Sequence, residues 1–385
     1  MIPLCEPVLA GREWDYVKQC LDSGWVSSVG KFVDRFEAEF AHALGVGHAV
    51  AMTSGTSALH IALLVAGVAA DDEVLIPALT FIAPANAIRY CNAWPVFVDI
   101  DPLTWQIDAA QVRCFLEQDC ERVDGVLRNR ASGRRVKALL PVHLLGHPCA
   151  MAELVELAET HGLALVEDAT ESLGARIQGR SVGGFGQAAC FSFNGNKLLT
   201  TGSGGMLVSN DETVARRARY LSTQAKDSAE YRHDSIGFNY RLTNVQAAMG
   251  CAQLELLAEK LAAKRRIAER YRRELVEPLG LDMLWEAPGC VSALWLSTVL
   301  LPQGWSAAAR GALRQELSDS GIETRPLWLP IPYDPPYAGA QVVGGAVFDD
   351  VWTRALSLPS SCNLTDDQQS RVIDALRRGI GRGAV

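Results

Sequence analysis

The chain has 385 residues, of which 49% are hydrophobic and 21% charged, as in a globular protein with room for a large and a smaller domain. Its formal net charge is -8, from 36 Lys and Arg against 44 Asp and Glu, so it lacks the basic excess typical of nucleic-acid-binding proteins. The 10 cysteines are dispersed without a Cys-x-x-Cys pair, so we expect reduced thiols and no metal site.

The sequence predicts neither a signal peptide nor a membrane span. Its first residues lack a basic start followed by an apolar core. The longest apolar run, from Ala58 to Ala70, contains His60 and Gly67 and is too short to cross a bilayer. Together with the dispersed cysteines, these features lead us to expect a cytoplasmic protein without a membrane partner.

Seven short apolar segments predict β-strands, and helical patterns alternate with them. The expected strands span residues 49–53, 73–77, 95–99, 138–143, 164–168, 188–193 and 205–208. The expected helices include residues 57–66, 149–161 and 213–222. This alternation predicts an α/β protein whose mostly parallel sheet is covered by helices on both faces. In such sheets ligands bind beyond the carboxyl ends of the strands.

Two segments depart from this alternation. Residues 119–137 contain the turn dipeptides Asp124-Gly125 and Ser132-Gly133, which predict a small hairpin inserted before the strand at residue 138. After residue 242, a long helical pattern over residues 244–275 is followed by a smaller α+β portion with proline-rich turns. We expect a large domain over residues 1–250, which includes the hairpin, and a small C-terminal domain over residues 251–385.

Lys197 and Asp168 carry the most specific chemical signal. Lys197 ends the segment Phe191-Ser-Phe-Asn-Gly-Asn-Lys197, and Asp168 closes the strand predicted just before it. A lysine amine forms a Schiff base with the aldehyde of pyridoxal phosphate (PLP), and a carboxylate keeps the pyridine nitrogen protonated. Taken singly, a lysine is more often solvated and an aspartate after a strand more often caps a helix. The pair, at the ends of two neighbouring strands, favours a PLP site.

Residues near this pair suit the rest of such a cofactor. The segment Ser54-Gly55-Thr56-Ser57 lies between a predicted strand and a helix, where backbone N–H groups and hydroxyls form a phosphate cradle. Ser and Thr are equally common there as structural N-caps. Ser192 adds a hydroxyl close to the lysine. Phe81 follows the strand at 73–77 and is expected to stack on the pyridine ring, the alternative being a place in the core.

Two glutamates flank Asp168. Glu171 lies one turn further on and is expected on the same side, near the ring hydroxyl of the cofactor. Glu167 points to the opposite face of the strand by alternation, so we expect it to be structural. Lys197, once released from the cofactor, is expected to act as the base that moves a proton between substrate and cofactor carbons, a role that needs a neutral amine.

These residues, in this order, resemble the DegT/StrS family of sugar-nucleotide aminotransferases, which are PLP enzymes. The resemblance extends from about Pro3 to the last predicted helix, and the ordered set of its segments is highly specific. The matching segments are Trp25-Val-Ser-Ser-Val-Gly30, Thr53-Ser-Gly-Thr-Ser-Ala-Leu-His60, Pro77-Ala-Leu-Thr-Phe81, Pro141-Val-His-Leu-Leu-Gly146, Glu167-Asp-Ala-Thr-Glu171, Gly237-Phe-Asn-Tyr-Arg-Leu-Thr-Asn244 and Thr324-Arg-Pro-Leu-Trp328.

The resemblance implies the aspartate aminotransferase fold (fold type I). In that fold a large domain surrounds a mixed, mostly parallel seven-stranded sheet, and a smaller α+β domain follows it. The resemblance further implies that Lys197 forms the Schiff base, that Asp168 binds the pyridine nitrogen and that Glu171 lies near the ring hydroxyl. The other cofactor contacts it implies are Gly55, Thr56, Ser192 and Phe81.

The family consists of homodimers whose active sites lie at the subunit interface. By this resemblance, Asn239 reaches the phosphate of the neighbouring subunit's cofactor, and Arg241 helps to hold the substrate or phosphate of that site. Trp25 and Arg325 are the further substrate residues that it implies. Dimerisation would therefore be part of the chemistry.

The resemblance also bears on the substrate. Many members have histidine two residues after the serine, whereas this chain has Asn194, which is similar to the subset that makes 4-amino sugars. The insertion at 124–133, with Trp25 and the segment 80–84, resembles the LegC/NeuE-type branch. That branch implies amino transfer from glutamate to C4 of a UDP- or GDP-linked 4-keto-6-deoxy-N-acetylglucosamine, for legionaminic-acid or bacillosamine-type surface glycans.

Three alternatives stay open at this point. A C3 aminotransferase and a sugar dehydratase both keep PLP, although dehydratases of this kind carry histidine in place of Lys197. A non-catalytic regulatory or binding protein of the same fold is the alternative from another class. It would be expected to have lost Lys197 or Asp168, and both are present.

Overall fold

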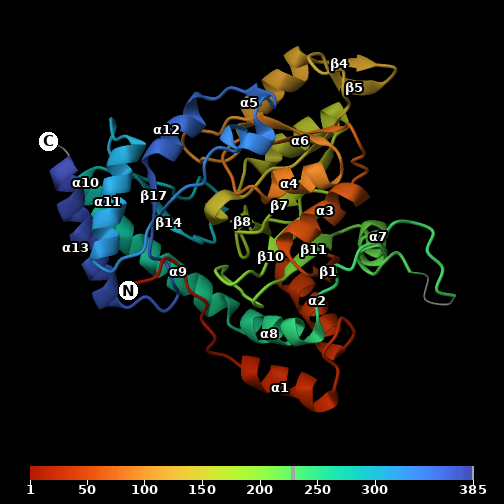
Figure 1. Cartoon of the computed structure of the whole chain (residues 1–385), viewed down its shortest axis with the longest axis horizontal. Helices are drawn as coiled ribbons and strands as arrows, with labels where there is room; N and C mark the ends of the chain where they lie inside the picture. The colour runs from red at the N-terminus through yellow and green to blue at the C-terminus, as the bar shows by residue number, and fades with distance from the viewer. Residues whose placement is uncertain (227–229, 384–385) are drawn as a thin grey trace.

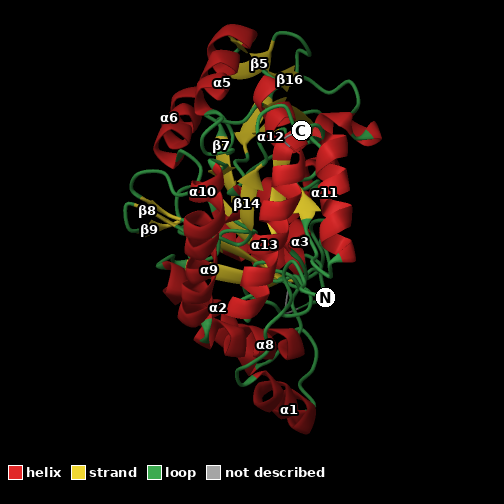
Figure 2. Ribbon diagram, turned by 90° about the vertical axis from the view of Figure 1, so that its left-hand side faces the viewer, coloured by secondary structure: helices red, strands yellow, loops and turns green. Residues whose placement is uncertain are grey.

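The computed structural model describes residues 1–226 and 230–383, which are arranged around a mixed sheet of eight strands (Figures 1 and 2). Only β11 runs antiparallel to its neighbours; all the other pairs are parallel. In spatial order the strands are β1 (His48–Met52), β11 (Gly205–Ser209), β10 (Ala188–Ser192), β7 (Ala164–Asp168), β6 (Val136–Leu139), β2 (Glu73–Pro77), β3 (Trp94–Val98) and β16 (Val342–Val343).

Seven of these strands are the predicted ones, so the α/β prediction is confirmed. The expected count of seven is one strand short, because β16 from the C-terminal part of the chain pairs with the edge strand β3. With only two residues, β16 has no periodicity that a sequence pattern could reveal.

Helices cover both faces of the sheet (Figure 2). The alternation along β1 shows how: Val50 and Met52 face the core under α3, α4 and α7, while Ala49 and Ala51 face the core under α2 and α8. A third core lies between the other end of the sheet and helices α5 and α6. The bounds of these helices are α2 Lys31–Leu44, α3 Gly55–Val65, α4 Ala83–Tyr90, α5 Ala109–Cys114, α6 Met151–His161, α7 Glu212–Ser222 and α8 Asn244–Glu255.

The predicted hairpin is confirmed. β4 (Cys120–Val123) and β5 (Val126–Asn129) pair in antiparallel fashion, and Asp124 and Gly125 connect them with φ angles of 50° and 78°. Positive φ at both positions is the geometry that Asp-Gly favours in two-residue hairpins. Figure 1 shows this hairpin at one end of the molecule.

The single long helix expected over residues 244–275 is wrong. Helix α8 ends at Glu255 and α9 (Leu257–Tyr271) begins after Leu256, whose φ and ψ of -101° and 8° interrupt the helix. The reason is tertiary, because α8 packs against α1 (Glu13–Ser23) and α2, whereas α9 contacts β14 of the C-terminal sheet. The expected domain boundary at residue 250 falls within α8, and we propose Leu256 as its position.

The C-terminal part has an antiparallel sheet and a core of its own. Its sheet has the order β12 (Asp282–Met283), β14 (Ser297–Leu300), β17 (Ala355–Leu358) and β15 (Arg325–Pro326). The remaining helices there are α10 Glu277–Leu279, α11 Ala307–Asp319, α12 Ala346–Arg354 and α13 Asp366–Gly383.

The two parts of the chain are interleaved. The amino-terminal residue Ile2 pairs with Ile322 of the C-terminal part, and β13 (Cys290–Val291) extends the small hairpin of β8 (Arg176–Ile177) and β9 (Arg180–Ser181). None of the helices in residues 1–226 and 230–383 combines the length and the hydropathy needed to span a bilayer.

The start of β11 gives a stability prediction. A Cβ on Gly205 would lie 2.4 Å from the backbone carbon of Ser54, so Gly205→Ala should cost about 1–3 kcal/mol of unfolding free energy, as overpacking does. On α11, a Cβ on Gly311 meets nothing within 4 Å, so Gly311→Ala should raise stability by about 0.5–1 kcal/mol. Urea denaturation measures both, and equal effects would contradict the close approach.

Candidate active site

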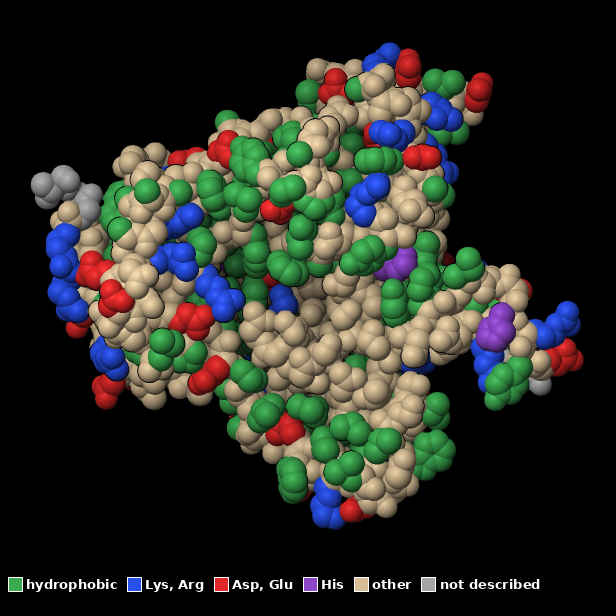
Figure 3. Space-filling model, viewed as in Figure 1, with side chains coloured by type: hydrophobic (Ala, Val, Ile, Leu, Met, Phe, Trp, Pro, Cys, Tyr) green, Lys and Arg blue, Asp and Glu red, His purple; other side chains and the backbone are tan. Residues whose placement is uncertain are grey.

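Most of the candidate residues lie in a cavity of about 350 Å³ at the carboxyl ends of β1, β2, β7 and β10, where the C-terminal part closes over the sheet. Figure 3 shows a hollow near the middle of this face. This is the edge of a parallel sheet where ligands bind. The cavity is lined by Ser54, Gly55, Thr56, Phe81, Asp168, Thr170, Glu171, Ser192, Asn196, Lys197, Trp295, Arg325 and Trp328, among others.

Lys197 lies in the loop after β10 with its amine inside the cavity. Its side chain is 14% exposed, and Nζ is 3.1 Å from Glu171 Oε1 and 4.0 Å from the centre of the Trp295 ring. The second carboxylate oxygen of Glu171 accepts the backbone N–H of Leu145 at 2.8 Å. Two of the predicted site residues, Lys197 and Glu171, are therefore in direct contact, although Glu171 was expected near the ring hydroxyl of the cofactor.

Asp168 is the last residue of β7 and is 2% exposed. Burial raises the pKa of its carboxyl, and hydrogen bonding from Thr170 and the nearby charge of Lys197 oppose that effect. Within the described residues, no Lys, Arg or His forms an ion pair with it. A buried carboxylate without a contacting cation is a ready partner for a positively charged ring nitrogen.

The amino end of α3 suits a phosphate group. Ser54 and Ser57 form a capping box, which satisfies the N–H of Ser57. The N–H groups of Gly55 and Thr56 have no acceptor in the part of the chain that the structure describes, and a helix amino terminus attracts anions. A Cβ on Gly55 would lie 2.9 Å from Ser192 Cβ, so only glycine leaves this approach open.

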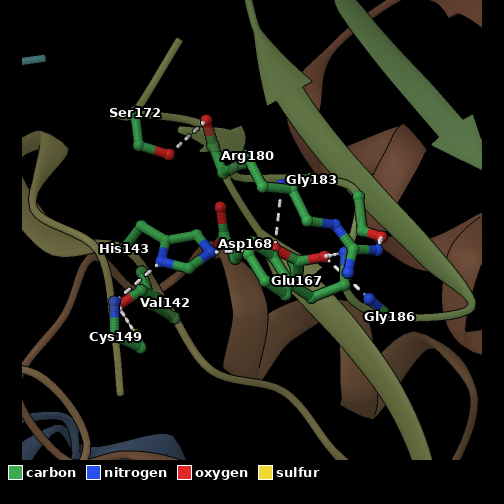
Figure 4. Close-up of polar contacts among 12 residues, drawn as sticks. Val142, His143, Cys149, Glu167, Asp168, Ser172, Arg180, Gly183 and Gly186 are labelled. Atoms are coloured by element: carbon green, nitrogen blue, oxygen red, sulfur yellow. Dashed lines mark hydrogen bonds and ion pairs between the residues drawn. The ribbon is translucent and has the colours of Figure 1, made fainter. Parts of the chain in front are cut away.

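Glu167 points away from the cavity, as its position in β7 predicts. It is fully buried and accepts the backbone N–H groups of Gly183, Phe185 and Gly186 at 2.7–2.8 Å (Figure 4). Although burial alone would raise the pKa of Glu167, hydrogen bonds from His143 and these backbone groups hold it below its usual range. Glu167 therefore fixes the loop behind Asp168.

His143 completes this network. The backbone N–H of Cys149 donates to His143 Nδ1 at 3.0 Å, so the imidazole carries its proton on Nε2 and donates it to Glu167 at 3.2 Å. The backbone N–H of His143 donates to the carbonyl of Asp168 at 3.0 Å. His143 therefore holds the end of β7 in two ways: its ring binds the Glu167 side chain, and its backbone N–H binds the Asp168 carbonyl.

Three aromatic side chains line the cavity wall. Phe81 is half-exposed and its ring centre is 6.1 Å from that of Trp328, which in turn stacks on Trp295 at 6.5 Å and 11°. The place of Phe81 in the cavity agrees with its expected role. Trp295 and Trp328 were not predicted as site residues: Trp328 ends one of the matching segments, but no pattern around Trp295 marks it.

Four further predicted residues lie at the edge of this cavity or outside it. Arg325 lines its mouth and pairs with Glu323 at 2.9 Å, with 61% of its side chain exposed. Arg241 is buried, and its guanidinium contacts Glu37 at 2.6 Å within the same chain. Trp25 and Asn239 are exposed on the surface and do not line the cavity. A single chain therefore brings together the predicted cofactor contacts except Asn239.

The cavity combines a lysine amine, a buried carboxylate and an anion cradle. These are the groups that bind, respectively, the aldehyde carbon, the ring nitrogen and the phosphate of PLP. The chain's own residues therefore fit this cofactor.

Comparison with known proteins agrees with this geometry. The model of the DegT/DnrJ/EryC1/StrS aminotransferase family matches residues 7–377. GDP-perosamine synthase from Caulobacter vibrioides is 40% identical over 378 residues, covering 97% of both chains, and the putative pyridoxal phosphate-dependent aminotransferase EpsN from Bacillus subtilis is 39% identical, covering 97% of this chain and 95% of EpsN. The crystal structure of S. venezuelae DesV in complex with a ketimine intermediate has a TM-score of 0.84 at 34% identity, covering 96% of this chain and 94% of the DesV chain.

The fold is that of PLP-dependent sugar aminotransferases. The chain belongs to the DegT/DnrJ/EryC1/StrS aminotransferase family. Pyridoxal phosphate is the cofactor of this family, so the expected fold, family and cofactor are confirmed.

Replacing Asp168 by asparagine should raise the stability of the PLP-free protein and weaken its binding of PLP. Its raised pKa in the folded protein means that ionisation opposes folding once the pH exceeds the unfolded value of about 4. Asp168→Asn should therefore stabilise the PLP-free protein at pH 7 by on the order of 1 kcal/mol, with a gain that fades as the pH falls towards about 4 and is absent below that pH. The same variant should retain PLP poorly. Thermal unfolding with and without PLP separates the effects, and a destabilised PLP-free variant would contradict the prediction.

Proposed function

We propose that this chain transfers an amino group from glutamate to C4 of a nucleotide-linked 4-keto-6-deoxy sugar. The observation that carries the proposal is the convergence of Lys197, Asp168 and the amino end of α3 on one cavity. Membership of a family of PLP-dependent nucleotide-sugar aminotransferases supplies the class of reaction. The position of the amine and the identity of the sugar are parts of the proposal.

Each residue has a defined part in the proposed chemistry. Bound PLP supplies an electron sink that stabilises negative charge on the carbon next to the amine. Asp168 keeps the proton on the ring nitrogen, and the free N–H groups of Gly55 and Thr56 hold the phosphate. Lys197 holds the cofactor and, once free, moves a proton at the reacting carbon, first from glutamate and later to the sugar.

Glu171 is proposed to hold the Lys197 amine in position. Its carboxylate contacts Nζ at 3.1 Å and is itself fixed by the N–H of Leu145. This arrangement differs from a role at the ring hydroxyl alone, because the carboxylate contacts the amine directly. Phe81 is proposed to cover one face of the ring.

The substrate proposal combines three observations. Asn194, in place of the histidine found in many members, favours a 4-amino sugar, and the hairpin of β4 and β5 favours an N-acetylated sugar for legionaminic-acid or bacillosamine-type glycans. The GDP-perosamine synthase relative supports a GDP-linked keto sugar. We therefore propose GDP as the nucleotide to test first, with the UDP-linked N-acetylated sugar as its competitor.

The first test uses the absorption of the purified protein. Bound PLP should give a yellow band that glutamate bleaches, and a 4-keto-6-deoxy sugar should restore it. Parallel incubations with the GDP-linked hexose and the UDP-linked N-acetylated hexose compare the two substrates, and NMR of the product distinguishes C4 from C3. A protein that stays colourless with PLP would contradict the enzyme proposal and favour a binding protein.

Lys197→Ala should lower turnover by on the order of 10³-fold or more, because both the covalent link and the mobile proton are lost. Lys197→Arg should fail equally, since a guanidinium keeps its proton and cannot act as the base. Far-ultraviolet circular dichroism checks that both variants fold. Substantial steady-state activity in either variant would remove Lys197 from this role.

We also propose a homodimer with shared active sites. Asn239 is exposed, and Figure 1 shows α7 and the described residues on either side of 227–229 projecting from the side of the molecule, as a segment that reaches a second copy would. The ion pair between Arg241 and Glu37 supports a role for Arg241 in holding this segment instead of contacting the partner's substrate. A cytoplasmic location belongs to the same proposal, because all ten cysteines are free thiols.

Mixing two defective variants tests the shared sites. In a mixed dimer of Lys197→Ala and Asn239→Ala, one site receives both substitutions and the other receives neither. Half of randomly mixed dimers contain both variants, and each of these has one intact site out of two. About one quarter of the wild-type activity should therefore return. Light scattering on the unmixed proteins measures the oligomeric state. No recovery from a mixture of proven dimers would contradict a shared site.

A further inference from the structure

A buried lysine outside the cavity is connected to the loop that carries Lys197. Lys264 of α9 is 1% exposed, and its Nζ donates to the carbonyls of Trp295 at 2.7 Å and Ser360 at 2.5 Å. The same Nζ lies 3.5 Å from Cys5 Sγ. These three acceptors match the three N–H bonds of an ammonium. No carboxylate among the described residues forms an ion pair with Lys264. Its hydrogen bonds instead connect α9 to the three segments that contain Cys5, Trp295 and Ser360.

Two of these segments converge on the residue before Lys197. The indole Nε1–H of Trp295 donates to the carbonyl of Asn196 at 2.8 Å, and Cys5 Sγ donates to the same carbonyl at 3.3 Å. The Asn196 carbonyl belongs to the planar peptide unit that leads to the Cα of Lys197. Its orientation therefore sets the direction in which the Lys197 side chain leaves the loop.

Trp295 also contacts the amine, and Leu145 links Trp295 to the carboxylate of Glu171. Its ring lies 4.0 Å from Lys197 Nζ, a cation–π distance. Its backbone N–H donates to the carbonyl of Leu145 at 3.1 Å, and the N–H of Leu145 donates to Glu171 at 2.8 Å. Trp295 is thus fixed through its N–H, its carbonyl and its indole, and Lys264 supplies the bond to the carbonyl.

We infer that Lys264 is a positioning residue for Lys197, acting through Trp295 and Cys5 on the Asn196 carbonyl. The inference rests on the proposed role of Lys197 and does not depend on which sugar is the substrate. Lys264 takes no part in a chemical step. It holds the indole against the amine and keeps the peptide before Lys197 in one orientation, so that the amine meets the cofactor in a reactive geometry.

The competing explanation is that Lys264 only attaches α9 to the C-terminal part. Lys260, one turn earlier on the same helix, provides a matched control. It is 5% exposed, and its Nζ donates to Gln253 Oε1 and, at 3.2 Å, to the carbonyl of Val8. None of the contacts described for Lys260 involves Trp295, Cys5 or Asn196. Replacing either lysine by methionine removes one buried ammonium from α9, but only the replacement of Lys264 removes a hydrogen bond to Trp295 and Cys5, the two residues that bind the Asn196 carbonyl. Among the described residues, Lys260 reaches the loop only through Gln253, at Thr200, which lies outside residues 194–198.

The experiment compares Lys264→Met and Lys260→Met as PLP-loaded proteins in the glutamate half-reaction, which needs no sugar. Lys264→Met should lower the single-turnover rate constant by on the order of tenfold to a hundredfold, and Lys260→Met by about twofold or less. Hydrogen exchange over residues 194–198, with and without PLP, should be faster only in Lys264→Met. The visible circular dichroism of the bound cofactor should change only in that variant.

A second substitution keeps the test decisive if Lys264→Met fails to fold. Trp295→Phe retains an aromatic ring near the amine but removes the N–H that donates to Asn196. It should speed exchange over the same residues and slow the half-reaction, and in the Lys264→Met background it should add little, because the connection is already broken.

Two results would overturn the inference: equal effects of Lys264→Met and Lys260→Met, or unchanged exchange over residues 194–198 and an unchanged half-reaction rate in Trp295→Phe. Failure of the proposed function is distinguishable from both. It would appear in the wild-type protein as the absence of a PLP band that glutamate bleaches, whereas exchange over residues 194–198 in the PLP-free protein still reports the connection.

Discussion

The structure depends on keeping one carboxylate, that of Asp168, dry at the end of a buried strand. A carboxylate in that position has a raised pKa and weakens the folded protein until a cation comes to it. The surrounding chain compensates with hydrogen bonds from Thr170 and with the loops on either side of β7. A cofactor with a protonated ring nitrogen then gains its binding energy from a group that the empty protein has already desolvated.

Because side chains alternate along β7, the residue that faces the cavity and the residue that holds the neighbouring loop are adjacent in sequence. Asp168 faces the cavity, whereas Glu167, its neighbour, faces the opposite side and binds three backbone N–H groups and His143. Two adjacent acids therefore have different environments and different pKa directions, although their side chains have the same chemistry. The backbone bond from His143 to the carbonyl of Asp168 connects the two sides.

The interleaving of the two parts of the chain closes the site. Trp295, Trp328 and Arg325 come from the C-terminal part, and Cys5 comes from the amino terminus, which runs along that part. Trp295 and Cys5 contact the loop of Lys197 because the C-terminal part packs over the edge of the large sheet. A movement of the C-terminal part would therefore change the positions of the Asn196 carbonyl and the Lys197 amine, which Trp295 contacts.

The sequence by itself determined the strand order along the chain, through local periodicity, and the hairpin at Asp124-Gly125, through turn chemistry. It also determined the convergence of Gly55, Asp168 and Lys197, because the carboxyl ends of parallel strands meet at one edge of the sheet. Only the tertiary structure decided the break at Leu256, the eighth strand and the parts played by Trp295 and Lys264. These features come from packing between segments far apart in the chain, and no local pattern records which distant side chain will fill a given space.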